Sequence, residues 1–216
     1  MDNVFLERIV AALLAGVGVT VEVTVGAMAV AVVIGLGLAT VDFLAKARIV
    51  HALIRIYVEA LRNIPSLTFL FLLYFGLAAV GIRLSSMVAA VLGLGLIGGA
   101  VAVDIFRSGL HSVPAGQKEA AASIGLTPFA AFRLIVLPQG LRLSLPSLGN
   151  YAVGLVKDTS LVAAIAAPEV MFSARQLVNE TFETGLIYGC TALVYLALTT
   201  AVAGSLSFAE RKLETP

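Results

Sequence analysis

The chain has 216 residues, of which 60% are hydrophobic and 12% are charged, and its formal net charge is +1. An ordinary soluble domain carries about 25% charged residues, so the composition excludes such a domain and indicates a chain that lies mostly in lipid. The small net charge gives no indication of nucleic-acid binding. A single cysteine, Cys190, excludes an internal disulfide bond.

Apolar stretches of the length needed to cross a bilayer, about 20 residues in a helix, recur along the chain. Residues 5–14 are expected to form an interfacial lead-in. Five spans are predicted, at about 17–41, 60–80, 85–105, 145–167 and 185–208. We therefore expect an all-α membrane protein in which residues 1–216 form a single domain. The odd number of spans places the two termini on opposite sides of the membrane.

The basic residues predict which terminus is outside, because cytoplasmic loops carry an excess of Lys and Arg. With the N-terminus outside and the C-terminus inside, Arg8, Arg83 and Arg175 are external and Lys157 lies within the fourth span. The remaining basic residues are cytoplasmic: Lys46, Arg48, Arg55, Arg62, Arg107, Lys118, Arg133, Arg142, Arg211 and Lys212. The opposite orientation would reverse this bias. The external segment after the fourth span is acidic, with Glu169, Glu180 and Glu183.

A polar break interrupts the start of the second span, at Arg62, Asn63, Pro65 and Ser66. Pro65 has no backbone N–H to donate, so carbonyl groups near it need other partners. Such a break can line a cavity, or it can be a structural interruption without any further role.

The third span is predicted to pack closely against a neighbouring helix, because it carries Gly93, Gly95, Gly98 and Gly99. At its cytoplasmic end, Asp104 and Arg107 have the spacing of an i,i+3 ion pair. His51 and His111 have no other metal-binding side chains near them in the sequence. We expect both histidines at the surface and no metal site.

The longest cytoplasmic segment, residues 106–144, has the sequence pattern of two short helices. Ser112 can cap the first helix, with Pro114 in its first turn. Gly125 can end that helix, because glycine readily adopts the left-handed conformation found after helices. Between these points, residues 117–124 are rich in alanine, and small side chains let another surface approach closely.

A second short helix follows in the same segment. Thr127 is placed to cap it, Pro128 to begin it, and Pro138 to end it. The two helices would form a hairpin just under the membrane. The pattern alone leaves two interpretations open, a hairpin that packs only on its own protein and one that binds a partner.

The fourth span contains Lys157 and Asp158 near its middle. A charge at the bilayer centre costs about 2.5–3.5 kcal/mol on insertion scales, and adjacent helix positions point in different directions. Either these side chains line a polar path, with Thr159 and Ser160 adding hydroxyl groups, or they pair with other helices and hold the fold together. Glu22, in the first span, is expected near the external interface.

Motifs for chemistry are absent from the sequence. No GxxxxGK[ST] loop is present, so the chain does not bind and hydrolyse ATP by that device. There is also no HExxH or CxxC motif. We expect no enzyme activity, and accordingly no catalytic residue and no cofactor.

The stretch KEAAASIGLTPFAAFRLIVLP at 118–138 matches the pattern EAA-x3-G-x9-I-x-LP at every specified position. This pattern resembles the EAA signature of ABC-importer permease subunits, and the resemblance extends over about residues 16–212. It implies a coupling helix that docks in a groove of an ATP-binding subunit, with Glu119 as its anchor and Gly125 permitting its turn. The residues assigned to this coupling are Glu119, Ala120, Ala121, Gly125 and Pro114.

Further stretches are similar to the polar amino acid branch of these permeases, the histidine, glutamine and arginine type. They are RNIPSLTFLFLLYFGL at 62–77, FRSGLHSVPAGQKEAA at 106–121 and LPQGLRLSLPSLGNYAVGLVKDTSL at 137–161. The chain departs from the branch at Ile64, where Thr is common, and at Val101 and Asp104, where Tyr and Glu are common. These departures leave the coupling role intact but weaken any inference from the substrate of one particular relative.

The resemblance implies a permease of the type I ABC importer fold in the bacterial inner membrane, carrying polar amino acids. Its partners would be two copies of an ATP-binding subunit, which hydrolyses the ATP, a second identical or related permease subunit, and an external solute-binding protein. The substrate path would include Asp158, Lys157, Thr159, Ser160, Asn63 and Pro65. Two alternatives stay open: a permease for an opine, an amino acid derivative or an organic cation, and a regulatory membrane partner of an ATPase that transports nothing.

Overall fold

The computed structural model describes residues 3–214, and the side chains of residues 4–206; within this range every regular element is a helix. Residues 1–2 and 215–216 of the predicted domain, and the side chains of Arg211 and Lys212, lie outside the described part. The helices are α1 (Asn3–Leu44), α2 (Arg48–Asn63), α3 (Ser66–Phe71), α4 (Leu77–Ala79), α5 (Ser86–His111), α6 (Ala115–Ser123), α7 (Pro128–Ala131), α8 (Leu137–Asp158), α9 (Val170–Thr181) and α10 (Thr184–Glu214). Two π-helical turns, η1 (Leu72–Gly76) and η2 (Phe132–Val136), and the 3-10 helix η3 (Thr159–Ile165) complete the set.

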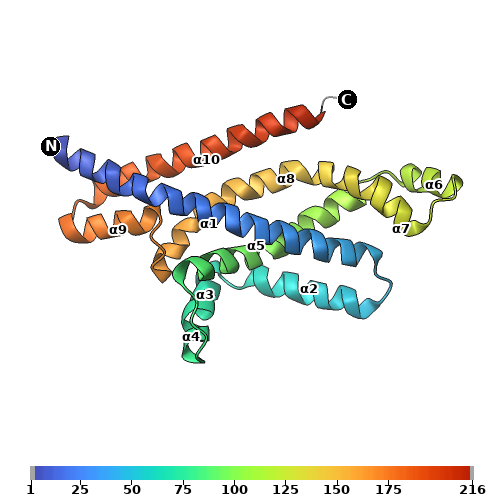
Figure 1. Cartoon of the computed structure of the whole chain (residues 1–216), viewed down its shortest axis with the longest axis horizontal. Coiled ribbons are helices and arrows are strands. Elements are labelled where there is room, and N and C mark those ends of the chain that lie inside the picture. Colours follow the sequence, from blue (N-terminus) through green and yellow to red (C-terminus); the bar gives the residue numbers. More distant parts are fainter. Residues whose placement is uncertain (1–2, 215–216) are drawn as a thin grey trace.

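The molecule is an elongated bundle built around α1 and α5, which pack against each other over much of their length (Figure 1). Helix α8 packs against both α5 and α1, and α9 and α10 pack near the N-terminal half of α1. The short helices α6 and α7 form a hairpin at one end of the bundle, which we call the hairpin end. The N-terminus and α9 lie at the opposite end.

Small residues bring α1 and α5 into direct backbone contact. A Cβ atom added to Gly35 of α1 would lie 2.4 Å from the Cβ of Ala102 on α5. A Cβ added to Gly95 of α5 would lie 2.7 Å from the Cβ of Val30 on α1. The close packing predicted for the glycine-rich third span is therefore confirmed, and the neighbour is α1. In lipid, such close approach is a main source of helix association.

The predicted count of five spans holds only if bent helix pairs are counted as single spans. Among the described residues, α1, α5 and α10 are each long and apolar enough to cross a membrane. Two bent pairs raise the number to five: α2 with α3–α4, bent by 103°, and the helix from α7 through η3 with α9, bent by 49°.

The predicted interfacial lead-in at 5–14 is not a separate element. It is continuous with the first span in the single 42-residue helix α1, because no proline interrupts the chain between residues 3 and 44. At 1.5 Å per residue this helix is about 60 Å long, twice the thickness of the hydrocarbon core.

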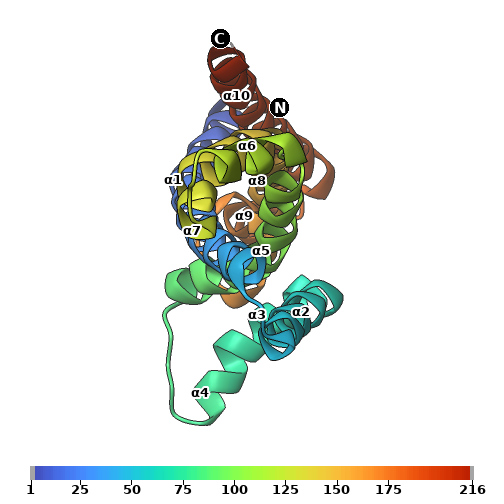
Figure 2. The same cartoon turned by 90° about the vertical axis from the view of Figure 1, so that its right-hand side faces the viewer.

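The second predicted span, 60–80, is divided by the bend between α2 and α3. Ile64 is extended, with φ −80° and ψ 129°, because the residue before a proline avoids the helical conformation. After this bend, α3 packs against α5 and η3 at its base, and the chain continues through α4 away from the bundle as an arm (Figures 1 and 2). The polar break read from the sequence is thus a change of direction for the whole chain.

The hairpin agrees with the sequence at its turn and differs at its two ends. Gly125 has φ +78°, and Thr127 Oγ1 accepts a hydrogen bond from the backbone N–H of Ala130, as predicted. Ser112 does not cap α6; it follows the last residue of α5, and its hydroxyl donates to the carbonyl of Ser108. Pro114 is the residue just before α6, outside its first turn.

Pro138 does not end the second helix of the hairpin, contrary to the prediction. The helix runs on from α7 through η2 into α8, and Pro138 lies in the first turn of α8. A proline breaks an α-helix because it lacks an N–H and its ring meets the carbonyl four residues earlier. The wider π-helical turn of η2 lies just before this proline and lets the chain continue past it.

Replacement of Gly35 by valine is expected to lower the melting temperature of the detergent-solubilised protein, because the new side chain would overlap Ala102. Overpacking of this kind costs about 1–3 kcal/mol. The matched control is Gly37→Val on the same helix, where an added Cβ meets no atom within 4 Å. Thermal unfolding followed by size-exclusion chromatography measures both; equal melting temperatures would contradict the close contact of α1 with α5.

Candidate functional site

The hairpin presents a mixed polar and apolar surface at its tip. Glu119 and Ala120 are exposed on α6, whereas Ala121 is buried at 1% exposure and packs on the protein itself. Beside them, Ile124 and Phe129 are 75% and 61% exposed. Of the three consecutive residues that open the EAA pattern, Glu119 and Ala120 therefore face outward and Ala121 faces the bundle.

Phe43, near the C-terminal end of α1, contacts several parts of the hairpin region. Its ring centroid lies 5.4 Å from that of His111 at the end of α5, and 5.3 Å from that of Phe132 in η2. The Nζ of Lys118 on α6 lies 5.0 Å from the centroid of Phe43, within range of a cation–π interaction. A hollow of about 350 Å³ opens beside these residues, lined also by Leu126. The hairpin is thus attached to the end of α1.

Sequence reasoning did not single out Phe43. An aromatic residue at the end of an apolar span is common at the edge of the bilayer, so the sequence offers no signal that separates this residue from others. Its contacts come from α5, α6 and η2, which lie far from Phe43 in the sequence.

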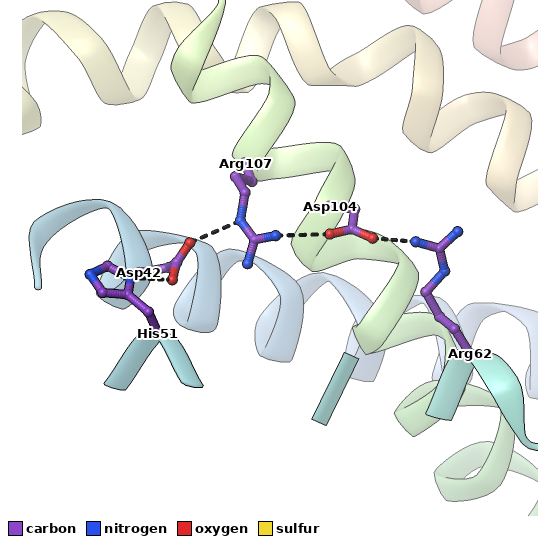
Figure 3. A network of polar contacts seen from close by, with 5 residues as sticks. All are labelled: Asp42, His51, Arg62, Asp104 and Arg107. Carbon is purple, nitrogen blue, oxygen red and sulfur yellow. Dashed lines mark hydrogen bonds and ion pairs between the residues drawn. The ribbon is translucent and has the colours of Figure 1, made fainter. Parts of the chain in front are cut away.

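A chain of five polar side chains joins α1, α2 and α5 near the hairpin end (Figure 3). Arg107 donates from Nε to Asp42 at 2.8 Å and from Nη1 to Asp104 at 3.1 Å. His51 Nδ1 lies 2.7 Å from the other oxygen of Asp42, and Arg62 donates to Asp104. The predicted pair of Asp104 with Arg107 is confirmed, but it belongs to a larger network, and His51 is not the isolated residue that the sequence suggested.

The residues predicted to line a path lie at two helix breaks. Asn63 and Pro65 stand at the bend between α2 and α3, and Lys157 and Asp158 end α8 where η3 begins. Helix α3 packs against η3, with Leu70 in the same apolar core as η3 residues. The fold therefore brings the two breaks, about 95 residues apart in sequence, into neighbouring positions.

The side chains at these breaks are not equivalent. Lys157 and Asp158 are exposed, and among residues 4–206 neither has an ion-pair partner within 4.0 Å. Asn63 is exposed, and its Nδ2 donates to the carbonyl of Glu59 at 2.6 Å. Thr159 is buried, and its hydroxyl donates to the carbonyl of Val156 at 2.7 Å; Ser160 is half-buried. Thr159 thus supports the helix end, and the two charged residues have free polar groups.

Glu169 has a structural position that the sequence did not reveal. The sequence places it in the acidic external segment, but its side chain is fully buried. Its carboxylate caps α9 by accepting from the backbone N–H of Phe172 at 2.8 Å, and it also accepts from the hydroxyl of Tyr195 on α10. Thr20 of α1 accepts from the N–H of Val170 at 3.4 Å. These bonds fix α9 to α1 and α10.

Residues 31–214 match the family described as "Binding-protein-dependent transport system inner membrane component". The chain is 38% identical over 158 residues to the probable amino-acid ABC transporter permease protein YckA of Bacillus subtilis, covering 73% of this chain and 70% of the relative. It is also 38% identical over 170 residues to the probable glutamine ABC transporter permease protein GlnP of Bacillus subtilis, covering 79% and 78% respectively.

The fold also matches a solved structure. A chain in the crystal structure of an amino acid ABC transporter with histidines superposes with a TM-score of 0.90 and 27% sequence identity. The match covers 98% of this chain and 99% of that chain, so the bends and the hairpin lie within the shared architecture.

Replacement of Arg107 by glutamine is expected to destabilise the protein by about 1–3 kcal/mol, because Arg107 donates charged hydrogen bonds to two carboxylates on two helices. Arg62→Gln is the matched comparison. It removes a single contact from a side chain that is 54% exposed, so a loss below about 1 kcal/mol is expected. Thermal unfolding in detergent compares the variants, and an equal or larger loss for Arg62→Gln would contradict the central place of Arg107.

Proposed function

The chain belongs to the family of binding-protein-dependent transport system inner membrane components, and on that premise we propose that it forms the translocation path of an ATP-driven importer for polar amino acids. As a multi-pass membrane protein of this family it is a permease subunit rather than an enzyme. ATP hydrolysis takes place on a separate subunit, in this proposal. The observation that carries the proposal is the exposed hairpin, which holds the EAA pattern at one end of the bundle.

The substrate class is supported by the relatives and by the chemistry at the helix breaks. The compared permeases are named for amino acids or glutamine, which favours an amino acid over the alternatives of another small solute or a regulator without transport. An amino acid carries one carboxylate and one ammonium group. Lys157 and Asp158 supply one charge of each sign, exposed and adjacent at the end of α8.

The substrate path, in this proposal, runs between the two neighbouring breaks. Its lining consists of Asp158, Lys157, Ser160, Asn63 and Pro65, and the buried Thr159 supports the helix end behind them. Broken helices at membrane depth are tolerated where they line a wet cavity, and they form the substrate sites of many transporters. A charge in hydrocarbon costs about 2.5–3.5 kcal/mol, so the exposed Lys157 and Asp158 are consistent with such a cavity.

The hairpin is the proposed contact with the ATP-binding subunit. Glu119 and Ala120 face outward, with Ile124 and Phe129 adding apolar surface beside them. A small residue at 120 allows a close approach, and Glu119 offers a carboxylate to anchor the helix in a groove. Ala121 packs inward and Gly125 holds the turn, while Pro114 directly precedes α6. This division lets one short helix bind a partner without losing its attachment to the bundle.

The proposed assembly contains two permease subunits, identical or related, because one bundle encloses little of a pathway. Two ATP-binding subunits dock on the two hairpins, which lie in the cytoplasm, and an external solute-binding protein delivers the amino acid. This places the N-terminus outside and the C-terminus inside. ATP binding draws the hairpins together and opens the path outward, and hydrolysis resets it.

Reconstitution tests this function directly. The chain would be purified with its co-purifying ATPase, placed in liposomes, and supplied with the binding protein and a panel of amino acids. A polar amino acid is expected to stimulate ATP turnover and to accumulate inside. Turnover that ignores every external solute, with no uptake, would favour a regulatory membrane protein instead.

Coupling through the hairpin predicts that Glu119→Lys and Gly125→Val each reduce ATP-driven uptake to background while membrane insertion stays normal. The first reverses the charge of the exposed anchor. The second places a β-branched residue at φ +78°, which such residues strongly disfavour. Uptake of labelled amino acid into proteoliposomes is the measurement.

Matched controls separate coupling from general damage. Gly125→Asn should keep most of the uptake, since asparagine tolerates the left-handed conformation. Glu183→Gln, an exposed change near the opposite end of the bundle, should have no effect. Full uptake by both Glu119→Lys and Gly125→Val would rule out the coupling role of the hairpin.

The path residues predict a different phenotype. Asp158→Asn should reduce uptake at least tenfold while the basal ATP turnover of the complex is unchanged. The reason is that a charged group of the substrate would lose an interaction worth about 1.4 kcal/mol or more, which corresponds to a factor of ten. Ser147→Ala, at an exposed position on the same helix, is the control. Wild-type uptake by Asp158→Asn would show that Asp158 is not part of the substrate path.

A further inference from the structure

Helix α2 carries three distinct faces. One face is buried against α5, with Ile54 and Val58 at 5% and 6% exposure. A second face is exposed and apolar, with Leu53 and Ile56 at 60% and 63% exposure. The third face is exposed and charged, and at 100° per residue it contains Arg48, Arg55 and Glu59, with Ala52 between them.

The charged face extends alongside helices that are able to cross the membrane. His51 pairs with Asp42 near the end of α1, and from there α2 runs back along the bundle toward its middle (Figure 1). At 1.5 Å per residue, Glu59 lies about 12 Å farther along the axis than His51. Tyr57 donates to the carbonyl of Leu96 inside α5 at 2.8 Å. The charged face of α2 therefore extends from the hairpin end toward the middle of the bundle.

Lipid cannot cover this face without a large cost. Among residues 4–206, neither Arg55 nor Glu59 has an ion-pair partner within 4.0 Å, and unpaired charges are expelled from hydrocarbon. Lipid can cover the neighbouring face with Leu53 and Ile56, because burying apolar side chains in hydrocarbon has no such cost. The two exposed faces of one helix thus require two different surroundings.

We propose that the charged face of α2 lines a water-filled vestibule that opens at the hairpin end, through which the solute leaves; this rests on the proposed transport function. The vestibule is continuous with the proposed path, because Asn63 follows the charged face and its Nδ2 bonds to the carbonyl of Glu59. Guanidinium and carboxylate groups along its wall suit a zwitterionic solute, since each end of such a solute meets an opposite charge.

Thiol accessibility tests this arrangement. In a Cys190→Ser background, single cysteines would be placed at Arg55 and Glu59 on the charged face, and at Leu53 and Ile56 on the apolar face. A charged, membrane-impermeant methanethiosulfonate is then added to inside-out membrane vesicles that contain the full chain. Modification is expected to be at least tenfold faster on the charged face.

Two outcomes would overturn the proposal. Equal rates on both faces would mean that α2 lies in water outside the membrane, and slow modification of both Arg55→Cys and Glu59→Cys would mean that no water reaches the charged face. If those variants fail to fold, Ala52→Cys, on the same face, carries the comparison with Leu53→Cys. A fast charged face in a chain that supports no ATP-driven uptake would reject the transport function separately, since labelling does not depend on uptake.

Discussion

The contact between α1 and α5 is the constraint on which the rest of the structure depends. Glycine and alanine at facing positions let the two backbones meet, and in lipid this packing replaces the association that water drives in soluble proteins. The other segments are placed relative to this pair, with α8 and α2 on α5 and α9 on α1. A larger side chain at a position such as Gly35 would therefore disturb more than its own neighbourhood.

Two different kinds of contact converge on the end of α1. Asp42 belongs to the ionic network that holds α2 and α5 (Figure 3), and the next residue, Phe43, touches η2 and the hairpin helix α6. A displacement of the hairpin would thus reach α1 through packing, and α2 and α5 through ion pairs. This gives the proposed coupling a physical route, one that joins adjacent residues on a single rigid helix.

The free-energy cost of placing a charge in hydrocarbon explains why the helices are irregular where transport is proposed. A smooth bundle of apolar helices would give a polar solute no place to bind. Here α2 carries charges along one exposed face, the chain turns by 103° after it, and α8 gives way to a 3-10 helix next to Lys157 and Asp158. Each irregularity exposes groups that need water or a polar solute, and the packing of α3 against η3 brings the breaks together.

The sequence by itself determined the features that depend on local residues: the apolar lengths that require a membrane, the turn at Gly125, the cap at Thr127, and the EAA pattern that marks the hairpin. The tertiary structure alone decided the passage of the helix beyond Pro138, the direction of the arm, and the partners of His51, Phe43 and Glu169. The reason is physical. Turns and caps are settled by a residue and its near neighbours, whereas a bend, an ion pair or a buried carboxylate depends on contacts between segments far apart in the chain.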